Sequence, residues 1–396
     1  MQLLIASLIG LTCLLVGPVL LLFVQVLAAR LPSRRQAEAA PRRPRLAVLV
    51  PAHNEEQGLG ATLIALRAQM EAGDRLLMIA DNCTDDTAGV AASHQAEVVV
   101  RNDPVRRGKG YALDHGMRQL ALDPPELVVI VDADCELHPG GLNALALRCA
   151  ASGRPVQALY LMHAPPGASL RTRVGEFAWI VKNRVRPLGY HRLGLPCQLM
   201  GTGMAFPWAL LLNSPLASGS IVEDLQLGLA LAGAGAAPLF CPEARVTSAF
   251  PNNEEGLRAQ RTRWEHGHIA TLLAQGPRLL WLGLRRGRPE LVAMALDLCV
   301  PPLASLTLAL CALVGAGALL GATTGHWGAA ALASTATCVL GVSVLMAWQQ
   351  HGQGAVTLRE LLSAPWYVLG KLPVYARLLM QRQTNWVRTK RDDHAP

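Results

Sequence analysis

The chain has 396 residues, of which 51% are hydrophobic and 16% are charged. This composition is more apolar than that of an average soluble enzyme, so we expect membrane segments in addition to one large or two ordinary domains. The net charge is +8, and arginines cluster in pairs that often lie beside apolar runs. No basic helix or aromatic-interleaved motif accompanies these pairs. The charge therefore favours a membrane surface or an anionic substrate and argues against nucleic acid.

The nine cysteines are spread along the chain, and none forms a Cys-x-x-Cys pair. Zinc sites and disulfide frameworks are typically built from characteristically spaced cysteines. The pattern argues against both and is compatible with a catalytic part in a reducing compartment such as the cytosol.

An apolar stretch without a charge covers residues 3–28. It is long enough to cross a hydrocarbon core of about 30 Å as a helix. A signal peptide is the alternative, but its basic residues would precede the apolar run, whereas here the arginines follow it between residues 30 and 45. The positive-inside rule then places the next segment in the cytoplasm.

Membrane character returns towards the C-terminus. We predict one span over residues 291–320, disturbed by Asp297 and Pro301-Pro302, and another over residues 327–348. Asp297 is expected near the headgroups. Residues 358–380 are apolar but are interrupted by two prolines and a lysine, which favours a pair of interfacial amphipathic helices over a further span.

Between these segments, buried-strand patterns alternate with helical periodicity. Strands are predicted at residues 46–50, 76–80, 97–100 and 128–131, with a helix over residues 62–70. Strands that alternate with helices at this spacing indicate a mostly parallel, doubly wound sheet whose polar residues gather at one edge.

The following region is less regular. It is predicted to hold a strand at residues 156–162, a basic helix at 170–186, a turn and strand at 201–206, and a helix opening near 220 and ending near 231. Glu223 and Asp224 lie in the first turn of that last helix, where the dipole favours acidic side chains, so capping alone explains them. Residues 260–264 are predicted to lie on an Arg-rich helix before Gly267.

Two carboxylates, Asp132 and Asp134, directly follow the predicted strand at residues 128–131. In open α/β sheets, ligands bind beyond the carboxyl ends of the strands. Carboxylates two residues apart suit a hard cation that also binds phosphate oxygens of a substrate. A solvated turn before the next helix explains the same residues, so the pair alone leaves both interpretations open.

Seven polar or glycine-containing motifs follow one another between residues 46 and 275. They are Val50-Pro51-Ala52-His53-Asn54-Glu55, Asp81-Asn82-Cys83-Thr84-Asp85-Asp86-Thr87, Gly108-Lys109-Gly110, Asp132-Ala133-Asp134, Gly201-Thr202-Gly203, Glu223-Asp224 and Gln260-Arg261-Thr262-Arg263-Trp264. This ordered set resembles the membrane-integrated family 2 glycosyltransferases, which include cellulose, chitin, hyaluronan and bacterial exopolysaccharide synthases. The resemblance implies an α/β fold of GT-A type, a doubly wound, Rossmann-like mixed sheet with N- and C-terminal transmembrane helices.

The resemblance also implies an inverting, metal-dependent transfer from a nucleotide sugar. A divalent cation, Mg²⁺ or Mn²⁺, would be held by Asp134 and Asp132 and would offset the charge of the leaving diphosphate. The acceptor hydroxyl must lose a proton, a task that falls to Asp224 with Glu223 in support. Donor binding is assigned to Pro51, Ala52, Glu55, Asp81, Lys109, Asp132, Gln260, Arg261 and Arg263, and acceptor binding to Gly201, Thr202, Gly203 and Trp264.

The predicted function is that of a hexosyl- or N-acetylhexosaminyltransferase that uses a nucleotide sugar, with a UDP-sugar favoured, to build a polysaccharide or glycolipid, as in exopolysaccharide synthesis. Trp264 offers an aromatic face for the acceptor sugar, and its motif favours repeated addition. Two alternatives stay open: single addition to a lipid carrier, and an inactive membrane scaffold of a polysaccharide complex. The expected partners are the donor, a saccharide or lipid-linked acceptor, membrane lipids and a polysaccharide-export partner, with no nucleic acid.

We thus expect a multi-pass protein of the inner (plasma) membrane with a cytoplasmic catalytic domain. The predicted parts are an N-terminal span (1–29), a basic linker (30–45), the catalytic domain (46–250), the Gln-Arg-x-Arg-Trp and interfacial helices (251–288), two spans (289–349), and interfacial helices with a basic tail (350–396).

Overall fold

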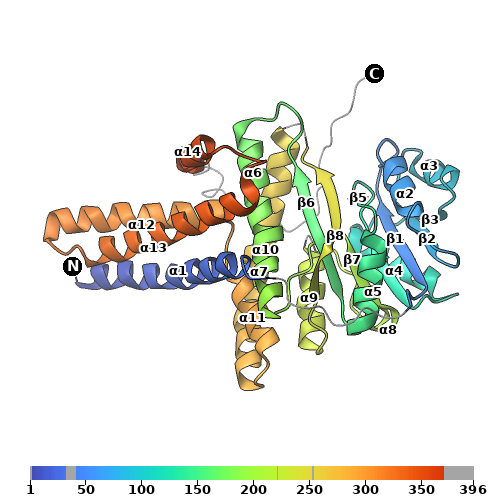
Figure 1. Ribbon diagram of the computed structural model, residues 1–396, viewed down its shortest axis with the longest axis horizontal. Coiled ribbons are helices and arrows are strands. Elements are labelled where there is room, and N and C mark those ends of the chain that lie inside the picture. The colour runs from blue at the N-terminus through green and yellow to red at the C-terminus, as the bar shows by residue number, and fades with distance from the viewer. Residues whose placement is uncertain (1, 33–41, 221, 252–253, 370–396) are drawn as a thin grey trace. The chain divides into compact units, whose positions relative to one another are not determined.

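The computed structural model describes residues 2–32, 42–220, 222–251 and 254–369. These residues form two compact units, whose elements are labelled in Figure 1. The helical unit holds residues 2–32, 164–193 and 265–369, and the sheet unit holds the remaining described residues up to 264. Each unit is therefore assembled from separate stretches of the chain.

Within the described residues, the sheet unit is built on one eight-stranded mixed sheet in the order β3-β2-β1-β4-β7-β6-β8-β5. Strands β1 to β4 run parallel, whereas β7 is antiparallel to both β4 and β6, and β5 is antiparallel to β8. This confirms the expected mixed α/β sheet. The strands are β1 (Leu46–Ala52), β2 (Arg75–Asp81), β3 (Glu97–Arg101), β4 (Leu127–Ile130), β5 (Glu136–Leu137), β6 (Val156–His163), β7 (Met204–Pro207) and β8 (Leu239–Ala249).

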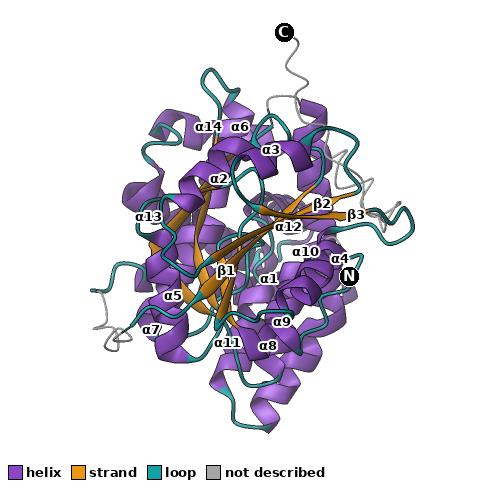
Figure 2. Cartoon of the chain, turned by 90° about the vertical axis from the view of Figure 1, so that its right-hand side faces the viewer, coloured by secondary structure: helices purple, strands orange, loops and turns teal. Residues whose placement is uncertain are grey.

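The central strands are apolar at every position because both faces of the sheet are covered. Residues 46–50 of β1 and 128–130 of β4 are fully buried. On one face, Leu49 and Ile130 join a core cluster with Leu113 and Leu227 from covering helices. Figure 2 shows the strands with helices on both sides. The helices of this unit are α2 (Leu59–Arg67), α3 (Thr87–Ser93), α4 (Lys109–Leu120), α5 (Gly141–Ser152), α8 (Trp208–Leu212) and α9 (Glu223–Gly233).

In the helical unit, α1 (Gln2–Ala28) lies beside α12 (Leu303–Thr324) and α13 (Gly328–Ala347), as Figure 1 shows. Among the described residues, three helices are long and apolar enough to cross a membrane: Gln2–Ala28, Leu303–Thr324 and Gly328–Gly352, the last including the π-helical turn η2 (Trp348–Gly352). The N-terminal apolar segment is therefore one continuous helix, as expected.

The prediction of a single span over residues 291–320 is wrong. The structure instead has α11 (Pro289–Leu298), a break, and then α12. Pro301-Pro302 causes the break, because proline lacks an amide donor and disfavours helix in the residue before it. The second helix that could cross a membrane, Leu303–Thr324, therefore starts later than expected.

Three other helices differ from expectation in extent. The helix predicted over residues 170–186 continues as α6 (Leu170–Ile180), the π-helical turn η1 (Val181–Val185) and α7 (Arg186–Leu193). The Arg-rich helix α10 (Glu254–Arg285) passes through Gly267 instead of ending before it. Of the segment predicted as interfacial helices, α14 covers Leu358–Leu369, and the rest lies outside the described residues.

A buried polar cluster joins three helices of the helical unit. Arg186 of α7 donates to the Asp297 carboxylate of α11 at 2.8 Å and to its carbonyl at 2.6 Å. Gln25 of α1 donates to the same carboxylate at 2.7 Å and accepts from Arg186 at 3.2 Å. Gln25 is fully buried. The charge of Asp297 is thus paired within the protein, which lowers the cost of placing a carboxylate in an apolar surrounding.

We predict that Gly189→Ala destabilises the helical unit. A Cβ at Gly189 would lie 2.0 Å from the carbonyl oxygen of Gln25, so α1 and α7 would have to separate. Such overpacking typically costs about 1–3 kcal/mol. The melting temperature in detergent should fall for Gly189→Ala and should not fall for the control Gly17→Ala, since no atom lies within 4 Å of a Cβ at Gly17. Equal melting temperatures for the two variants would contradict the close approach.

Candidate active site

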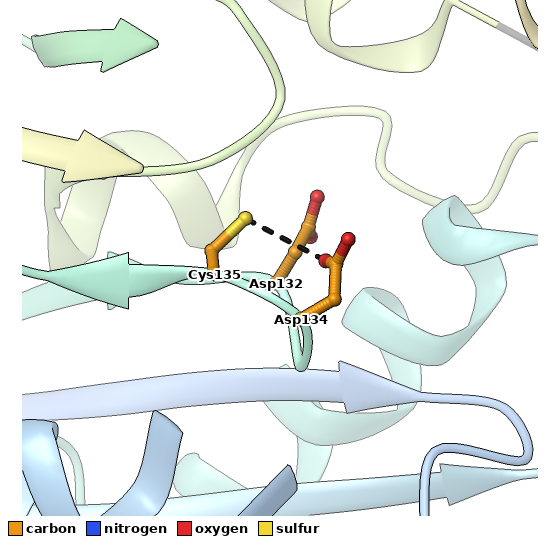
Figure 3. A group of neighbouring side chains, drawn as sticks. All are labelled: Asp132, Asp134 and Cys135. Atoms are coloured by element: carbon orange, nitrogen blue, oxygen red, sulfur yellow. Dashed lines mark hydrogen bonds between the residues drawn. The ribbon is translucent and has the colours of Figure 1, made fainter. Parts of the chain in front are cut away.

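A tight turn after β4 gathers the predicted metal ligands. The amide of Cys135 donates to the carbonyl of Asp132 at 3.1 Å, which folds residues 132–135 back on themselves. Figure 3 shows the side chains of Asp132, Asp134 and Cys135 together, and one ligand atom from each lies within 4.8 Å of the others. The turn and the metal interpretations of this motif are therefore compatible, because the turn itself brings the carboxylates together.

The loop before β7 holds this turn in place. The hydroxyl of Thr202 accepts from the amide of Asp132 at 3.0 Å, and Thr202 is fully buried. Gln157 of β6, also fully buried, donates to the Thr202 carbonyl at 2.9 Å and accepts from the Met200 amide at 2.7 Å. The side chain of Thr202, predicted to bind the acceptor, thus supports Asp132. Sequence reasoning missed Gln157, whose only signal is a polar residue inside an apolar strand.

Lys109 connects this turn to the rest of the site. It begins α4, directly after Gly108, whose φ of +126° lies in a region that glycine adopts readily. Its ammonium pairs with the Asp132 carboxylate and donates to the Gly201 carbonyl at 2.6 Å. Lys109 therefore joins β4, α4 and the loop before β7.

The acidic pair of α9 meets the same loop. A Cβ at Gly201 would lie 3.4 Å from an Asp224 carboxylate oxygen and 3.9 Å from the Lys109 ammonium, and the φ of Gly201 is +95°. Asp224 and Lys109 therefore converge on Gly201, where the absence of a side chain leaves room between them. The structure brings the predicted base within one cluster with Asp132, although these residues lie far apart in sequence.

Burial and charge act on this cluster together. Burial raises the pKa of Glu223 to about 7, and the neighbouring Asp224 adds to the rise while Lys109 opposes it. Burial also raises the pKa of Asp132, against the effect of Lys109. For Lys109, burial lowers the pKa, but Asp132 and Glu223 outweigh it, so the net shift is upward. Lys109 is therefore a permanent cation that offsets part of the carboxylate charge.

The carboxyl ends of β1, β2 and β3 form a second polar group. Asp81, at the end of β2, is buried and pairs with Arg101 of β3 at 2.5 Å. The His53 ring contacts the Asp81 carbonyl at 2.7 Å, and Asn82 accepts from the Asp103 amide at 2.8 Å. Arg101 was not predicted, because a single arginine closing a strand carries no motif. Pro51 and Ala52 end β1, and Glu55 follows in the next loop.

The Gln-Arg-x-Arg-Trp motif lies on the first turns of α10, as predicted for a helix. Gln260 is buried, and Arg263 and Trp264 are partly buried. The donor roles of Gln260, Arg261 and Arg263 and the acceptor role of Trp264 stay predictions.

Comparison with known proteins identifies the family of this chain. The family described as "Glycosyltransferase like family 2" matches residues 44–267, which is more than half of the chain. The chain therefore belongs to this glycosyltransferase family. The matched segment contains the β4 turn, Lys109, the Gly201 loop, Glu223-Asp224 and the α10 motif.

Individual relatives align with only part of this chain. A protein named as an uncharacterized glycosyltransferase of Mycobacterium tuberculosis is 43% identical over 98 residues, which is 25% of this chain and 40% of that protein. An uncharacterized protein of Methanocaldococcus jannaschii is 33% identical over 92 residues, 23% of this chain and 36% of that one. The chain thus aligns with less than half the length of these relatives.

Among solved structures, the mannosyltransferase PcManGT of Pyrobaculum calidifontis, in complex with GDP-mannose and Mn²⁺, is similar in fold. The TM-score is 0.55 at 20% identity, covering 86% of this chain and 99% of that one. The likeness supports the GT-A-like fold of the chain.

We predict that Glu223→Gln changes the pH dependence of stability. Between the ordinary pKa of 4.5 and the folded value of about 7, folded Glu223 keeps a proton that the unfolded chain has lost. Stability therefore falls as pH rises through this window. We expect the melting temperature of Glu223→Gln, relative to that of the wild type, to increase as pH rises through this window and to stay higher above it. The melting temperatures are measured in the presence of a metal chelator.

The exposed Glu71, whose side chain is 63% exposed, provides the control Glu71→Gln. Parallel pH profiles for wild type and Glu223→Gln would contradict the effect of burial on Glu223.

Proposed function

We propose that the chain transfers a sugar from a nucleotide sugar to an acceptor hydroxyl with inversion at the anomeric carbon, dependent on a divalent cation. The observation that carries the proposal is the convergence of Lys109, Asp132 and Asp224 on Gly201. It supplies carboxylates for a cation and a base within one cluster, next to the carboxyl ends of the parallel strands where ligands of such sheets bind.

The carboxylates of Asp132 and Asp134 fit a cation such as Mn²⁺ or Mg²⁺, since hard cations take carboxylate oxygens. When bound, the cation offsets the negative charge that develops on the leaving diphosphate. The complex of the structurally similar PcManGT with GDP-mannose and Mn²⁺ supports this assignment. Lys109 adds a second fixed positive charge beside Asp132, which acts without chemical change.

The carboxylate of Asp224 takes the proton from the acceptor hydroxyl as that oxygen bonds to the anomeric carbon. The bond to the diphosphate breaks on the opposite face, and the nucleoside diphosphate leaves. Glu223, with its pKa raised to about 7, is only partly ionised at neutral pH, which reduces the negative charge beside Asp224. Gln260, Arg261 and Arg263 are proposed to bind the diphosphate, and Pro51, Ala52, Glu55 and Asp81 the nucleoside.

The proposed setting is the cytoplasmic face of the inner membrane, with the three apolar helices as spans. The acceptor is a growing polysaccharide or a glycolipid, consistent with an enzyme held beside lipids. Three spanning helices are too few to enclose a broad channel. A polysaccharide-export partner or a second copy of the chain would therefore be needed to form the channel through which a polysaccharide is secreted.

We predict that Asp224→Asn and Asp134→Ala each lower donor turnover by at least about 100-fold, because one removes the base and the other a metal ligand. Full-length protein in detergent would be given UDP- and GDP-sugars with and without Mn²⁺, and release of the nucleoside diphosphate would be measured. The control Asp114→Asn changes a carboxylate whose described partner is Arg118 on α4, and it should keep full activity. Unchanged turnover in both site variants would place the chemistry at another site, whereas no turnover in the wild type with any donor would favour the inactive-scaffold alternative.

We predict that excess donor yields long products and that Trp264→Ala shortens them, because repeated addition requires the terminal sugar to be held after each transfer. Product length, measured by gel or mass spectrometry, reports this directly. One discrete product from the wild type would contradict processive synthesis and favour single addition to a lipid carrier.

A further inference from the structure

The β4 turn contains one side chain that the proposed function leaves unused. Cys135 is 1% exposed, and its sulfur lies 3.5 Å from an Asp134 carboxylate oxygen. Figure 3 shows the thiol on the same side of the turn as both carboxylates, with the dashed line joining it to Asp134. The hydrogen bond from the Cys135 amide to the Asp132 carbonyl holds the backbone that carries these side chains.

We propose that Cys135 is a third protein ligand of the cation, so that the site prefers a softer divalent ion than Mg²⁺. The inference rests on the proposed metal dependence and adds to it a ligand and a selectivity. One ligand atom each from Asp132, Asp134 and Cys135 lies within 4.8 Å of the others, near the limit of about 4.4 Å that two bonds to one ion allow.

The sulfur-to-oxygen distance fits ligands of a common ion. Metal–sulfur bonds of about 2.3 Å and metal–oxygen bonds of about 2.1 Å place two neighbouring ligand atoms about 3.1–3.6 Å apart, for angles between octahedral and tetrahedral. The 3.5 Å between the Cys135 sulfur and the Asp134 oxygen lies in this range. Coordination replaces the thiol proton, which leaves to solvent, so the sulfur binds as thiolate.

The chemistry of the donor set then determines selectivity. Mg²⁺ takes oxygen ligands in near-octahedral geometry and gains little from sulfur. Thiolate ligands favour softer ions such as Co²⁺, Zn²⁺ and Cd²⁺. A purely structural role is the alternative, in which the thiol only donates a hydrogen bond to Asp134.

The test is a Co²⁺ titration of the full-length protein in detergent, because thiolate bound to Co²⁺ absorbs strongly in the near ultraviolet. We expect this absorption in the wild type and in Cys149→Ala, whose buried cysteine lies on α5 outside the cluster. It should be lost in Cys135→Ser. Affinity for Cd²⁺ should fall at least about 10-fold in Cys135→Ser, while affinity for Mg²⁺ stays within about 3-fold.

Asp134→Asn separates this inference from the proposed function. Co²⁺ binding that depends on Asp134 but shows no thiolate absorption in the wild type would overturn the role of Cys135 and leave the metal site standing. If Asp134→Asn bound each ion as the wild type does, the proposed metal site and the role of Cys135 would both fail. Circular dichroism of each variant shows whether it is folded.

Discussion

The ion pair between Lys109 and Asp132 is the interaction on which the site depends. It brings the first turn of α4 to the end of β4, and the hydrogen bond from Lys109 to the Gly201 carbonyl adds the loop before β7. Three segments that are distant in sequence thus meet at one ammonium group. Removing one partner of a poorly solvated pair leaves the other charge uncompensated, which costs more than the pair contributes. The positive charge at position 109 is therefore essential, because a neutral side chain there would leave the Asp132 carboxylate uncompensated.

The sequence predicts the parallel part of the sheet well and the ends of the helices less well. Residues 46–50, 76–80 and 128–130 are recognisable because continuous apolar runs suit strands buried on both faces. The antiparallel strands β5 and β7 are short, and their pairing is long-range, so local pattern does not determine it. Two helix ends were predicted wrongly. The helix predicted to run through Pro301-Pro302 is broken there, and the helix predicted to end before Gly267 continues through it.

For the site, motif reasoning located the acidic residues and Lys109 but not what supports them. Gln157 and Arg101 have no motif, and their roles depend on which loops the fold brings beside them. The resemblance assigned Thr202 to the acceptor as part of the Gly201-Thr202-Gly203 motif, and the structure shows in addition that its hydroxyl accepts from the Asp132 amide. Such contacts are decided by tertiary structure, in which a buried polar atom must find a partner.

The cluster of Gln25, Arg186 and Asp297 has a consequence for how the protein is made. Gln25 lies 161 residues before Arg186 and 272 residues before Asp297. In the proposed membrane setting, α1 would enter the bilayer before Arg186 and Asp297 have been made, so water and lipid headgroups would have to hydrogen-bond the Gln25 side chain until then. The helical unit thus reaches its final packing only after α11 has been made, so its assembly is a late event in biogenesis although its first helix is the first element of the chain.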